Sequence, residues 1–482
     1  MKLTAGLALS LLILPMSVPL SAQTMNLQQV IQQVVDHYPS LKVAAIQVER
    51  ARQENIKVEG QLAWQLSARG GVSRNISLFG TPTDRVDVSG QVQRQLSSGA
   101  SVSVNASMNR EDATTTFSPL QPNPSSTSIV DLSYRHPLAQ GSDNPVYTQG
   151  REQAHAREMI SRAERQAIHD QLAAQIIELY VSAITTQARM KNTRQAIERS
   201  QRLLAYINDR FGMGLTEEKD RLQAKAQLSR QQAELKTLQI FWQQQRIALN
   251  RLMGRDWSAE LNLVAEITPA QSSVSHTELF TQLSAYSPPL AKVNAQIKLA
   301  DTAIELARDA KKDNLDLLMF VGNQNYSGDT LAGTQSESEV FGGVSLEYQR
   351  GLNKSAYDAA IYQAQLDRDV ALENKKQLLE DLNYDLASLL AEIKMADAAV
   401  QAYQISVKNE RLKLKEAEQR YQSGRTDTDQ LIQFESQLSQ AMLSYELQKI
   451  EVNRRYHKLT LLLGQLWQMI KLPDYSFQGP GE

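Results

Sequence analysis

Long stretches of the chain place an apolar residue every three or four positions, which is the pattern of a helix that buries one face. The longest stretches predict two helical hairpins, over 148–254 and 356–464, and shorter helical segments are expected over 26–61 and 276–311. At 1.5 Å per residue, a helix of about 60 residues is roughly 90 Å long. Because such a helix cannot be buried in one small domain, it must pack lengthwise against other helices.

Two further stretches, 65–136 and 315–348, alternate apolar and polar residues, which is the pattern of β-strands. In the clearest strand, Val86, Val88 and Val92 share one face, and polar residues occupy the other. This division suits the wall of a membrane β-barrel, which has lipid on one side and water on the other. A half-buried sheet in a soluble protein produces the same alternation, and these residues alone do not decide between the two.

The chain repeats one plan twice. The helical hairpins turn at Gly214 and Gly424, which are 424 − 214 = 210 positions apart, and the glycines that follow the hairpins, Gly254 and Gly464, have the same spacing. Two anchors at one spacing indicate an internal duplication. The predicted parts after the N-terminal segment are a first repeat, 23–262, a second repeat, 263–472, and a flexible tail, 473–482.

The first repeat carries residues that the second lacks. Upstream of the turns Leu41 corresponds to Leu290, a spacing of 290 − 41 = 249, so the excess is 249 − 210 = 39 residues. They fall among the strands and predict one more β-hairpin, over about 85–111. Because a hairpin adds an even number of strands, the chain leaves the sheet on the side where it entered, and the helices of both repeats stay on one side.

Composition narrows the function. The 482 residues carry a formal net charge of −2, so nucleic acid is not expected as a partner. A lysine followed by an apolar run from Ala5 to Leu14 predicts a secretory signal peptide over 1–22. The chain has no Cys, which excludes disulfides, thiolate metal sites and an acylated cysteine as a lipid anchor. No later apolar run is long enough for a transmembrane helix, so a membrane role requires a β-barrel.

No motif points to catalysis. The six histidines are scattered and match no helical zinc-binding pattern. Gly212 and Gly214 follow a helix, whereas a phosphate-binding glycine loop follows a strand. We therefore expect no enzyme activity, no cofactor and no metal site.

The order of the parts is specific even though each motif is short. A signal peptide is followed by helix, strands, long helix, an aromatic-x-x-Gly turn and a second long helix, and all but the signal occur twice. The two turns are Phe211-Gly212-Met213-Gly214 and Tyr421-Gln422-Ser423-Gly424. This plan, which covers the mature chain, resembles the TolC family of outer-membrane efflux channels.

The resemblance implies an α+β membrane protein that forms a homotrimer. A β-barrel in the outer membrane would continue into a long α-helical barrel in the periplasm. Six strands from each chain would close 18 strands, unless the extra hairpin lies outside the wall and leaves 12. Outer-membrane lipid would surround the barrel.

The resemblance also implies a passive exit duct of a tripartite efflux or type I secretion system. Substrate would come from an inner-membrane pump through a periplasmic adaptor protein, and the hairpin tips would gate the duct. The sequence does not identify the cargo. The alternative is a periplasmic or surface coiled-coil scaffold without a pore.

The gate residues follow from the family's pattern around the two glycines. The family links neighbouring tips through an Asp and a Tyr, which match Asp220 and Tyr421, and its usual Arg stands one position early, as Arg425. The carboxylates that ring the family's constriction are replaced by Gln430 and Gln433. The candidate gate residues are Gly214, Asp220, Tyr421, Gly424, Arg425, Asp427, Asp429, Gln430 and Gln433.

Three carboxylates could stand in for the missing ring, those of Asp427, Asp429 and Glu435. A solvated position at the start of a helix is the ordinary alternative for Asp220, Asp427 and Asp429. Thr216 and Thr426 are expected to cap the helices that follow the turns. Contact with an adaptor is expected near the tips, with ordinary packing as the alternative, and the candidates are Leu215, Arg221, Leu222 and Leu431.

Overall fold

The computed structural model describes residues 24–76, 82–115, 122–264, 275–423 and 425–473. The predicted signal peptide, nearly all of the predicted tail and Gly424 lie outside the described residues.

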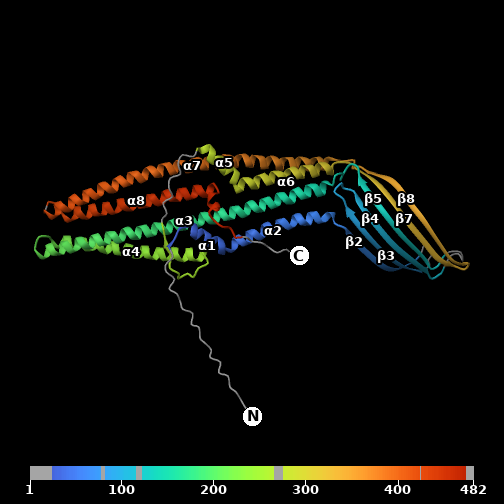
Figure 1. Cartoon of the computed structure of the whole chain (residues 1–482), viewed down its shortest axis with the longest axis horizontal. Helices are drawn as coiled ribbons and strands as arrows, with labels where there is room; N and C mark the ends of the chain where they lie inside the picture. The colour runs from blue at the N-terminus through green and yellow to red at the C-terminus, as the bar shows by residue number, and fades with distance from the viewer. Residues whose placement is uncertain (1–23, 77–81, 116–121, 265–274, 424, 474–482) are drawn as a thin grey trace, which may run out of the picture. The chain divides into compact units, whose positions relative to one another are not determined.

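The four long helices have closely matched bounds. The first hairpin consists of α3 (Pro145–Gly212) and α4 (Glu218–Leu252), and the second of α7 (Ser355–Gln422) and α8 (Thr428–Leu462). Each boundary in the second hairpin lies 210 residues after its counterpart, as in 355 − 145 and 462 − 252. The turns therefore stand at equivalent places in helices of equal length (Figure 1).

The two shorter predicted helices are each interrupted once. The first gives α1 (Leu27–His37) and α2 (Pro39–Glu59), and the second gives α5 (His276–Tyr286) and α6 (Pro288–Ala310). Each break precedes a proline, which disfavours the helical conformation in the residue before it. At the start of α1, the Asn26 side chain accepts the Gln29 N–H at 2.9 Å, and the Gln29 side chain accepts the Asn26 N–H at 3.0 Å. This reciprocal pair is a capping box.

The described residues fold into two compact units, each of which combines segments from both predicted repeats. The first contains β1 (Thr24–Met25), β6 (Asn262–Leu263), α1, α4, α8 and the parts of α3 and α7 that lead into the turns. The second contains α2, α6, the first parts of α3 and α7, and the main sheet. The boundary cuts α3 after His169 and α7 after Asp385.

In the first unit, a short parallel pair ties the N-terminal segment to the connector after α4. Thr24 lies opposite Asn262 and Met25 opposite Leu263. The Tyr180 hydroxyl, from the middle of α3, donates to the Val264 carbonyl at 2.6 Å and lies 3.2 Å from the Met25 carbonyl. Ile176 and Ile177 beside it are fully buried. No alternation in 262–275 predicted this pair.

The second unit is built on one antiparallel sheet with the strand order β2-β3-β4-β5-β7-β8. The strands are β2 (Gln65–Ile76), β3 (Pro82–Gln95), β4 (Ser101–Ala113), β5 (Ser125–Pro137), β7 (Asn314–Thr330) and β8 (Gly333–Gln349). The additional hairpin, β3–β4, lies inside the sheet between β2 and β5, so all six strands are in one layer (Figure 1). β5 pairs with β7 and joins strands that are far apart in the sequence.

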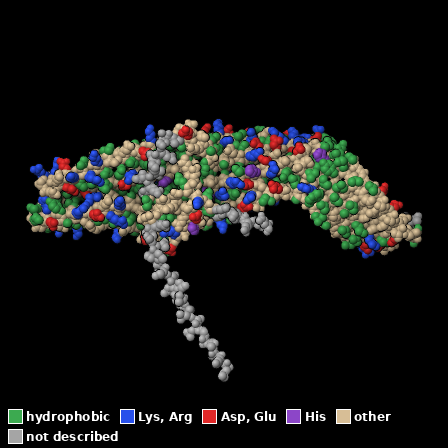
Figure 2. All heavy atoms as spheres, in the orientation of Figure 1, with side chains coloured by type: hydrophobic (Ala, Val, Ile, Leu, Met, Phe, Trp, Pro, Cys, Tyr) green, Lys and Arg blue, Asp and Glu red, His purple; other side chains and the backbone are tan. Residues whose placement is uncertain are grey.

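One face of this sheet is apolar across its whole width. The register places Val88 opposite Met108, and Val104 opposite Leu132, which in turn lies opposite Val321. Several members of this face are more than two-thirds exposed, namely Leu66, Val72, Val340 and Val344. On the side visible in Figure 2, hydrophobic side chains gather over the strands, while charged side chains are spread over the helices.

Over β2 to β5 the other face of the sheet is polar. Ser67, Gln91, Asn105 and Asp131 lie opposite one another on four neighbouring strands, and the Asn105 amide donates to Asp131 at 2.8 Å. The sheet therefore separates an uncovered apolar surface from a polar one, and an exposed apolar surface of this extent marks a contact with lipid or with protein.

The helices give no membrane-crossing segment. Among the described residues, no helix combines the length and the apolar character that crossing a bilayer demands.

Candidate functional site

The first hairpin tip is an α3–α4 turn closed by backbone hydrogen bonds. The Leu215 N–H donates to the Arg210 carbonyl and the Gly214 N–H to the Phe211 carbonyl, both at 2.9 Å. These two bonds define a Schellman motif, which requires a left-handed residue between them. Gly214 has φ +70, and nothing lies near the place of a Cβ. A side chain there would thus meet no clash, and its cost of about 1 kcal/mol would be conformational.

The helix after this turn starts one residue later than expected. Glu217, with an extended backbone, is the N-cap residue of α4, so the expectation that Thr216 caps the helix is wrong. The Glu217 N–H donates to the Asp220 carboxylate at 3.2 Å, and Asp220 therefore satisfies a backbone donor of its own hairpin. The hydrogen bond that Lys219 donates to the Glu217 carboxylate raises the pKa of Lys219, and the charges of Asp220 and Asp429 act in the same direction.

The second hairpin tip repeats this turn. The Arg425 N–H donates to the Arg420 carbonyl at 2.9 Å, which is the counterpart of the bond from Leu215 to Arg210. Asp427 is the N-cap residue of α8, and its carboxylate accepts the Gln430 N–H at 2.8 Å, so the cap is not the expected Thr426. Gly424, the predicted turn glycine, lies outside the described residues.

Tyr421 anchors the core of the second tip. Its hydroxyl is 2.9 Å from the Thr428 hydroxyl, so the bond bridges the end of α7 and the start of α8. The ring is 5% exposed and packs in a buried cluster with Leu414, Ala417, Leu431 and Leu438. Leu431 is therefore part of this core and is itself 5% exposed, and its role as an adaptor contact stays a prediction.

The remaining polar candidates differ in how far their side chains are exposed to solvent. Arg425, Asp429, Gln430 and Gln433 are exposed. Glu435 is buried, and it accepts a hydrogen bond from Arg199 of α3 at 2.6 Å. Because this ion pair holds the Glu435 carboxylate inside the unit, Glu435 does not replace the missing carboxylates.

The two tips expose different surfaces. The first tip exposes Met213 (70%), Leu215 (60%) and Leu222 (54%). Arg221 lies beside them, paired with Glu218 at 2.5 Å and with its guanidinium 5.0 Å from the centre of the Phe211 ring. The second tip has Ser423, Arg425 and half-buried Ile432 at the places of Met213, Leu215 and Leu222, and it has buried Leu431 at the place of Arg221. The tips are therefore equivalent in backbone and different in surface chemistry.

Arg210, Tyr206 and Thr428 were not among the predicted site residues. Arg210 of α3 reaches across to α7 and lies against two tyrosine rings, those of Tyr206 and Tyr421. The four-residue spacing of Tyr206 and Arg210, which puts both on one face of a helix, was a signal that could have identified them.

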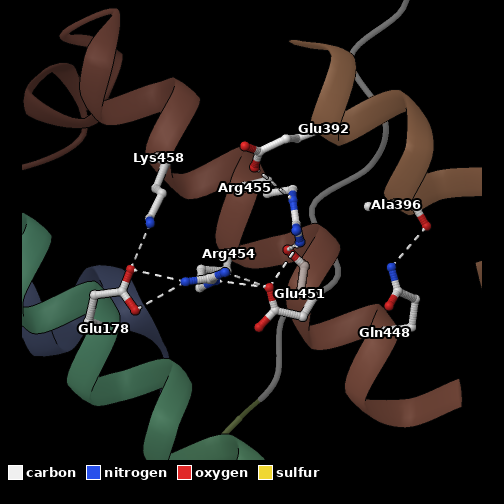
Figure 3. A network of polar contacts seen from close by, with 8 residues as sticks. All are labelled: Glu178, Glu392, Ala396, Gln448, Glu451, Arg454, Arg455 and Lys458. Carbon is white, nitrogen blue, oxygen red and sulfur yellow. Dashed lines mark hydrogen bonds and ion pairs between the residues drawn. The ribbon is translucent and has the colours of Figure 1, made fainter. Parts of the chain in front are cut away.

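Farther from the tips, an ion-pair network joins α8 to α3 and α7 (Figure 3). Arg454 contacts Glu451 at 2.8 Å and Glu178 of α3 at 3.4 Å, and Lys458 contacts Glu178 at 2.9 Å. Arg455 lies between Glu451 and Glu392 of α7. Burial raises the pKa of Glu178, but hydrogen bonds and charges from Lys458 and Arg454 outweigh it, and the pKa is lowered.

The sequence comparisons give a distant relative. No protein-family model matches the chain. Over 271 residues the chain is 20% identical to the pyoverdine export outer membrane protein OpmQ of Pseudomonas putida. The match covers 55% of this chain and 55% of that protein, so the chain spans about half the length of this curated relative.

The structural comparisons cover nearly the whole chain. The outer-membrane channel OprN superposes with a TM-score of 0.66 at 18% identity, over 92% of this chain and 90% of that one. The outer membrane protein VceC of Vibrio cholerae gives 0.62 at 15% identity, over 91% and 95%. The MtrE outer membrane channel of Neisseria gonorrhoeae, in its open state, gives 0.60 at 17% identity, over 91% and 88%.

These likenesses define the class of fold. The chain has the fold of TolC-like outer-membrane channels, and the resemblance that the sequence predicted is confirmed at the level of the fold.

Proposed function

We propose that this protein is the outer-membrane channel of an export system and acts as a passive duct. The observation that carries the proposal is the six-stranded sheet, which has an uncovered apolar face on a fold shared with outer-membrane channels. In water that face would be a large unpartnered apolar surface, whereas lipid covers it in a barrel wall. The scaffold alternative offers no cover for the face, and we do not retain it.

The sheet supports closure by further copies of the chain. β2 and β8 stand at the two ends of the strand order, and each has an unpaired edge among the described residues. An unpaired edge is a template for another strand. Pairing of β8 with β2 of the next copy is head to tail, and three copies in a ring give a homotrimer with 18 strands. The hairpin β3–β4 lies inside the sheet, which supports 18 strands over 12.

The helical hairpins form the periplasmic part of the channel in this proposal. The constant offset of 210 residues between their boundaries supports an internal duplication, with two hairpins per chain and six in the trimer. Helices of this length line a tube when they pack side by side. The two tips of each chain lie at the periplasmic end and narrow the duct.

The gate is polar and has few free carboxylates. Asp220 and Asp427 serve as helix caps, and Glu435 is paired with Arg199. Gln430 and Gln433 are exposed near the second tip, where the family has carboxylates. We therefore assign to this constriction a weaker affinity for cations than a carboxylate ring has.

We propose that protein partners bind at the tips and that lipid surrounds the sheet. A periplasmic adaptor contacts the first tip through Leu215, Leu222 and the aliphatic part of Arg221, and an inner-membrane pump supplies substrate and energy. Lipid surrounds the apolar face of the sheet. The curated relative is named for pyoverdine export, which favours efflux over protein secretion as the task of this channel.

Fractionation and conductance test the proposal together. The full-length protein should sediment with outer membranes, resist a high-salt wash, dissolve only in detergent, and give discrete conductance steps in a planar lipid bilayer. Release by salt as a water-soluble protein, or bilayers without conductance steps, would contradict a channel. Mass measurement in detergent should give three chains, and any other number would overturn the trimer without affecting membrane residence.

A further inference from the structure

One arginine connects the two hairpin tips of the chain. Arg210 is in the last turn of α3, and its Nη1 donates to the Tyr421 carbonyl of α7 at 3.4 Å. The same atom donates to the Tyr206 hydroxyl at 3.2 Å, within α3. A single guanidinium thus binds the end of the first hairpin to the end of the second.

The guanidinium also lies against two aromatic rings. Its carbon is 5.5 Å from the centre of the Tyr421 ring and 5.8 Å from that of Tyr206. The two rings are 5.7 Å apart and tilted by 58°. Cations within about 6 Å of a ring centre are attracted to its face. The hydrogen bond that Arg210 donates to the Tyr206 hydroxyl raises the pKa of Arg210 further above neutral pH.

The contact needs arginine in particular. A guanidinium is planar and carries five N–H donors, so it stacks on rings while it donates to a hydroxyl and a carbonyl. A lysine ammonium is a compact, strongly hydrated charge and cannot stack in this way.

Among the described residues, the second hairpin has no corresponding contact. Arg420 stands 420 − 210 = 210 residues later, at the equivalent helix end, and its Nη2 donates to Glu416 of its own helix at 2.5 Å. The position of Tyr206 is taken by that glutamate. The two arginines therefore have the same place in the backbone, but within the part of the chain that the structure describes only Arg210 contacts the other hairpin.

Tyr421 is held from the other side by its own hairpin. Its hydroxyl bonds to Thr428, and its ring is buried in the core of the second tip. It therefore forms a fixed surface against which Arg210 holds α3.

We propose that Arg210 is a positioning residue of the gate, which keeps the first hairpin tip against the second and so holds the duct closed. This rests on the proposed channel function. Opening that separates the tips within one chain must remove the guanidinium from the Tyr421 ring and carbonyl, while the Tyr421–Thr428 bond stays intact.

Planar-bilayer recordings of the full-length channel test the role. Arg210→Ala should raise the fraction of time that the channel is open at low voltage, by roughly five- to tenfold for each chain that carries the substitution. The reason is that both ring contacts and both hydrogen bonds of Arg210 are lost. Arg210→Lys should also open the channel, because the charge alone does not restore the stacking. Tyr206→Phe keeps both rings and removes one hydroxyl, so it should open the channel less than Arg210→Ala.

The matched control is Arg420→Ala, which removes an arginine from the equivalent helix end without touching the contact between hairpins. It should record as wild type. Equal opening by Arg420→Ala and Arg210→Ala would overturn the proposal, since the effect would then be a general loosening of the tips. The proposal would also be overturned if Arg210→Ala formed trimers of normal mass and a normal number of channels, and the open fraction of those channels equalled that of wild type. A wild-type protein that forms no channel would instead sink the proposed function itself.

Discussion

One buried histidine makes the stability of this protein depend on pH. His169 of α3 is 3% exposed, and burial, aided by the charge of Arg165, lowers its pKa from 6.5 to about 4. Between these pH values the unfolded chain binds a proton that the folded chain does not. Stability is therefore full above pH 6.5 and falls as the pH is lowered toward 4, by roughly 2 to 3 kcal/mol per chain.

Thermal unfolding of the detergent-solubilised protein checks this expectation. The midpoint for His169→Gln should depend less on pH between 6.5 and 4 than the wild-type midpoint does. His155→Gln changes an exposed histidine of the same helix and serves as the control. Parallel curves for wild type and His169→Gln would show that His169 does not govern the acid response.

The helix caps at the tips give a second prediction. Asp427→Ala leaves the Gln430 N–H without its acceptor and should destabilise the first turn of α8 by about 1 kcal/mol, whereas Asp427→Ser keeps a capping oxygen. Hydrogen exchange of the first α8 amides measures the change. Asp429 is exposed and lies two residues after Asp427, and Asp429→Ala should leave the exchange of these amides nearly unchanged.

Some residue roles near the tips could be predicted from the sequence, and others could not. The left-handed Gly214 could be predicted, since few residues tolerate that conformation. The capping residue was misplaced by one position at both tips, because Thr216 and Glu217, like Thr426 and Asp427, all carry a side-chain oxygen that can cap. Burial of Leu431 depends on Tyr421 and Leu438, and their proximity is a property of the packed hairpin.

At the scale of elements, helices were easier to predict than strands. The hairpins end within a few residues of their predicted bounds, because their apolar period continues almost to the turns. β7 and β8 extend well beyond the clear alternation, to Thr330 and Gly333, through a polar segment with no apolar signal. Backbone pairing between the two strands, which needs no apolar side chains, holds this segment in the sheet.

The hairpin β3–β4 is an element that can be removed. Deletion of 82–113 takes out two adjacent strands and leaves β2 and β5 antiparallel, so the sheet should reclose as β2-β5-β7-β8. Barrel diameter grows roughly in proportion to strand number, so a trimer of four-stranded sheets should be about two-thirds as wide. Electron microscopy of the detergent-solubilised variant measures the barrel width.

Deletion of β3 alone is the informative comparison, because it leaves an odd number of strands and directs the chain to the wrong end of the sheet. It should prevent assembly. A deletion variant lacking both strands that keeps the wild-type barrel width would place the hairpin outside the wall.

The number of chains in the assembly determines how many carboxylates a substitution adds to the proposed gate. In the proposed trimer a substitution near the tips occurs three times around the axis, so the double variant Gln430→Glu and Gln433→Glu would add six carboxylates at the proposed constriction. Such a ring attracts multivalent cations. We expect trivalent cations to block the variant at concentrations that leave wild-type conductance unchanged.

Conductance measured against cation concentration gives the comparison. The double variant Gln437→Glu and Gln440→Glu adds the same charge about two helical turns further along α8 and is the control for a general effect of charge. Wild-type channels blocked as readily as the double variant would show that other carboxylates already form the ring.

The arrangement of the compact units could not be predicted at this scale. The sequence suggests two consecutive repeats, whereas each unit draws segments from both. Contacts that join the two repeats, such as Arg199 with Glu435 in the first unit and β5 with β7 in the second, are between residues distant in the chain and give no periodic signal.

The pairing of β5 with β7 has a consequence for biosynthesis. β5 ends at Pro137 and β7 starts at Asn314, so 314 − 137 = 177 positions must be translated before the two strands can meet. Until then a nascent chain carries an open strand edge beside an apolar surface, and such surfaces aggregate. This interval is therefore the one in which a bound chaperone would protect the chain from aggregation.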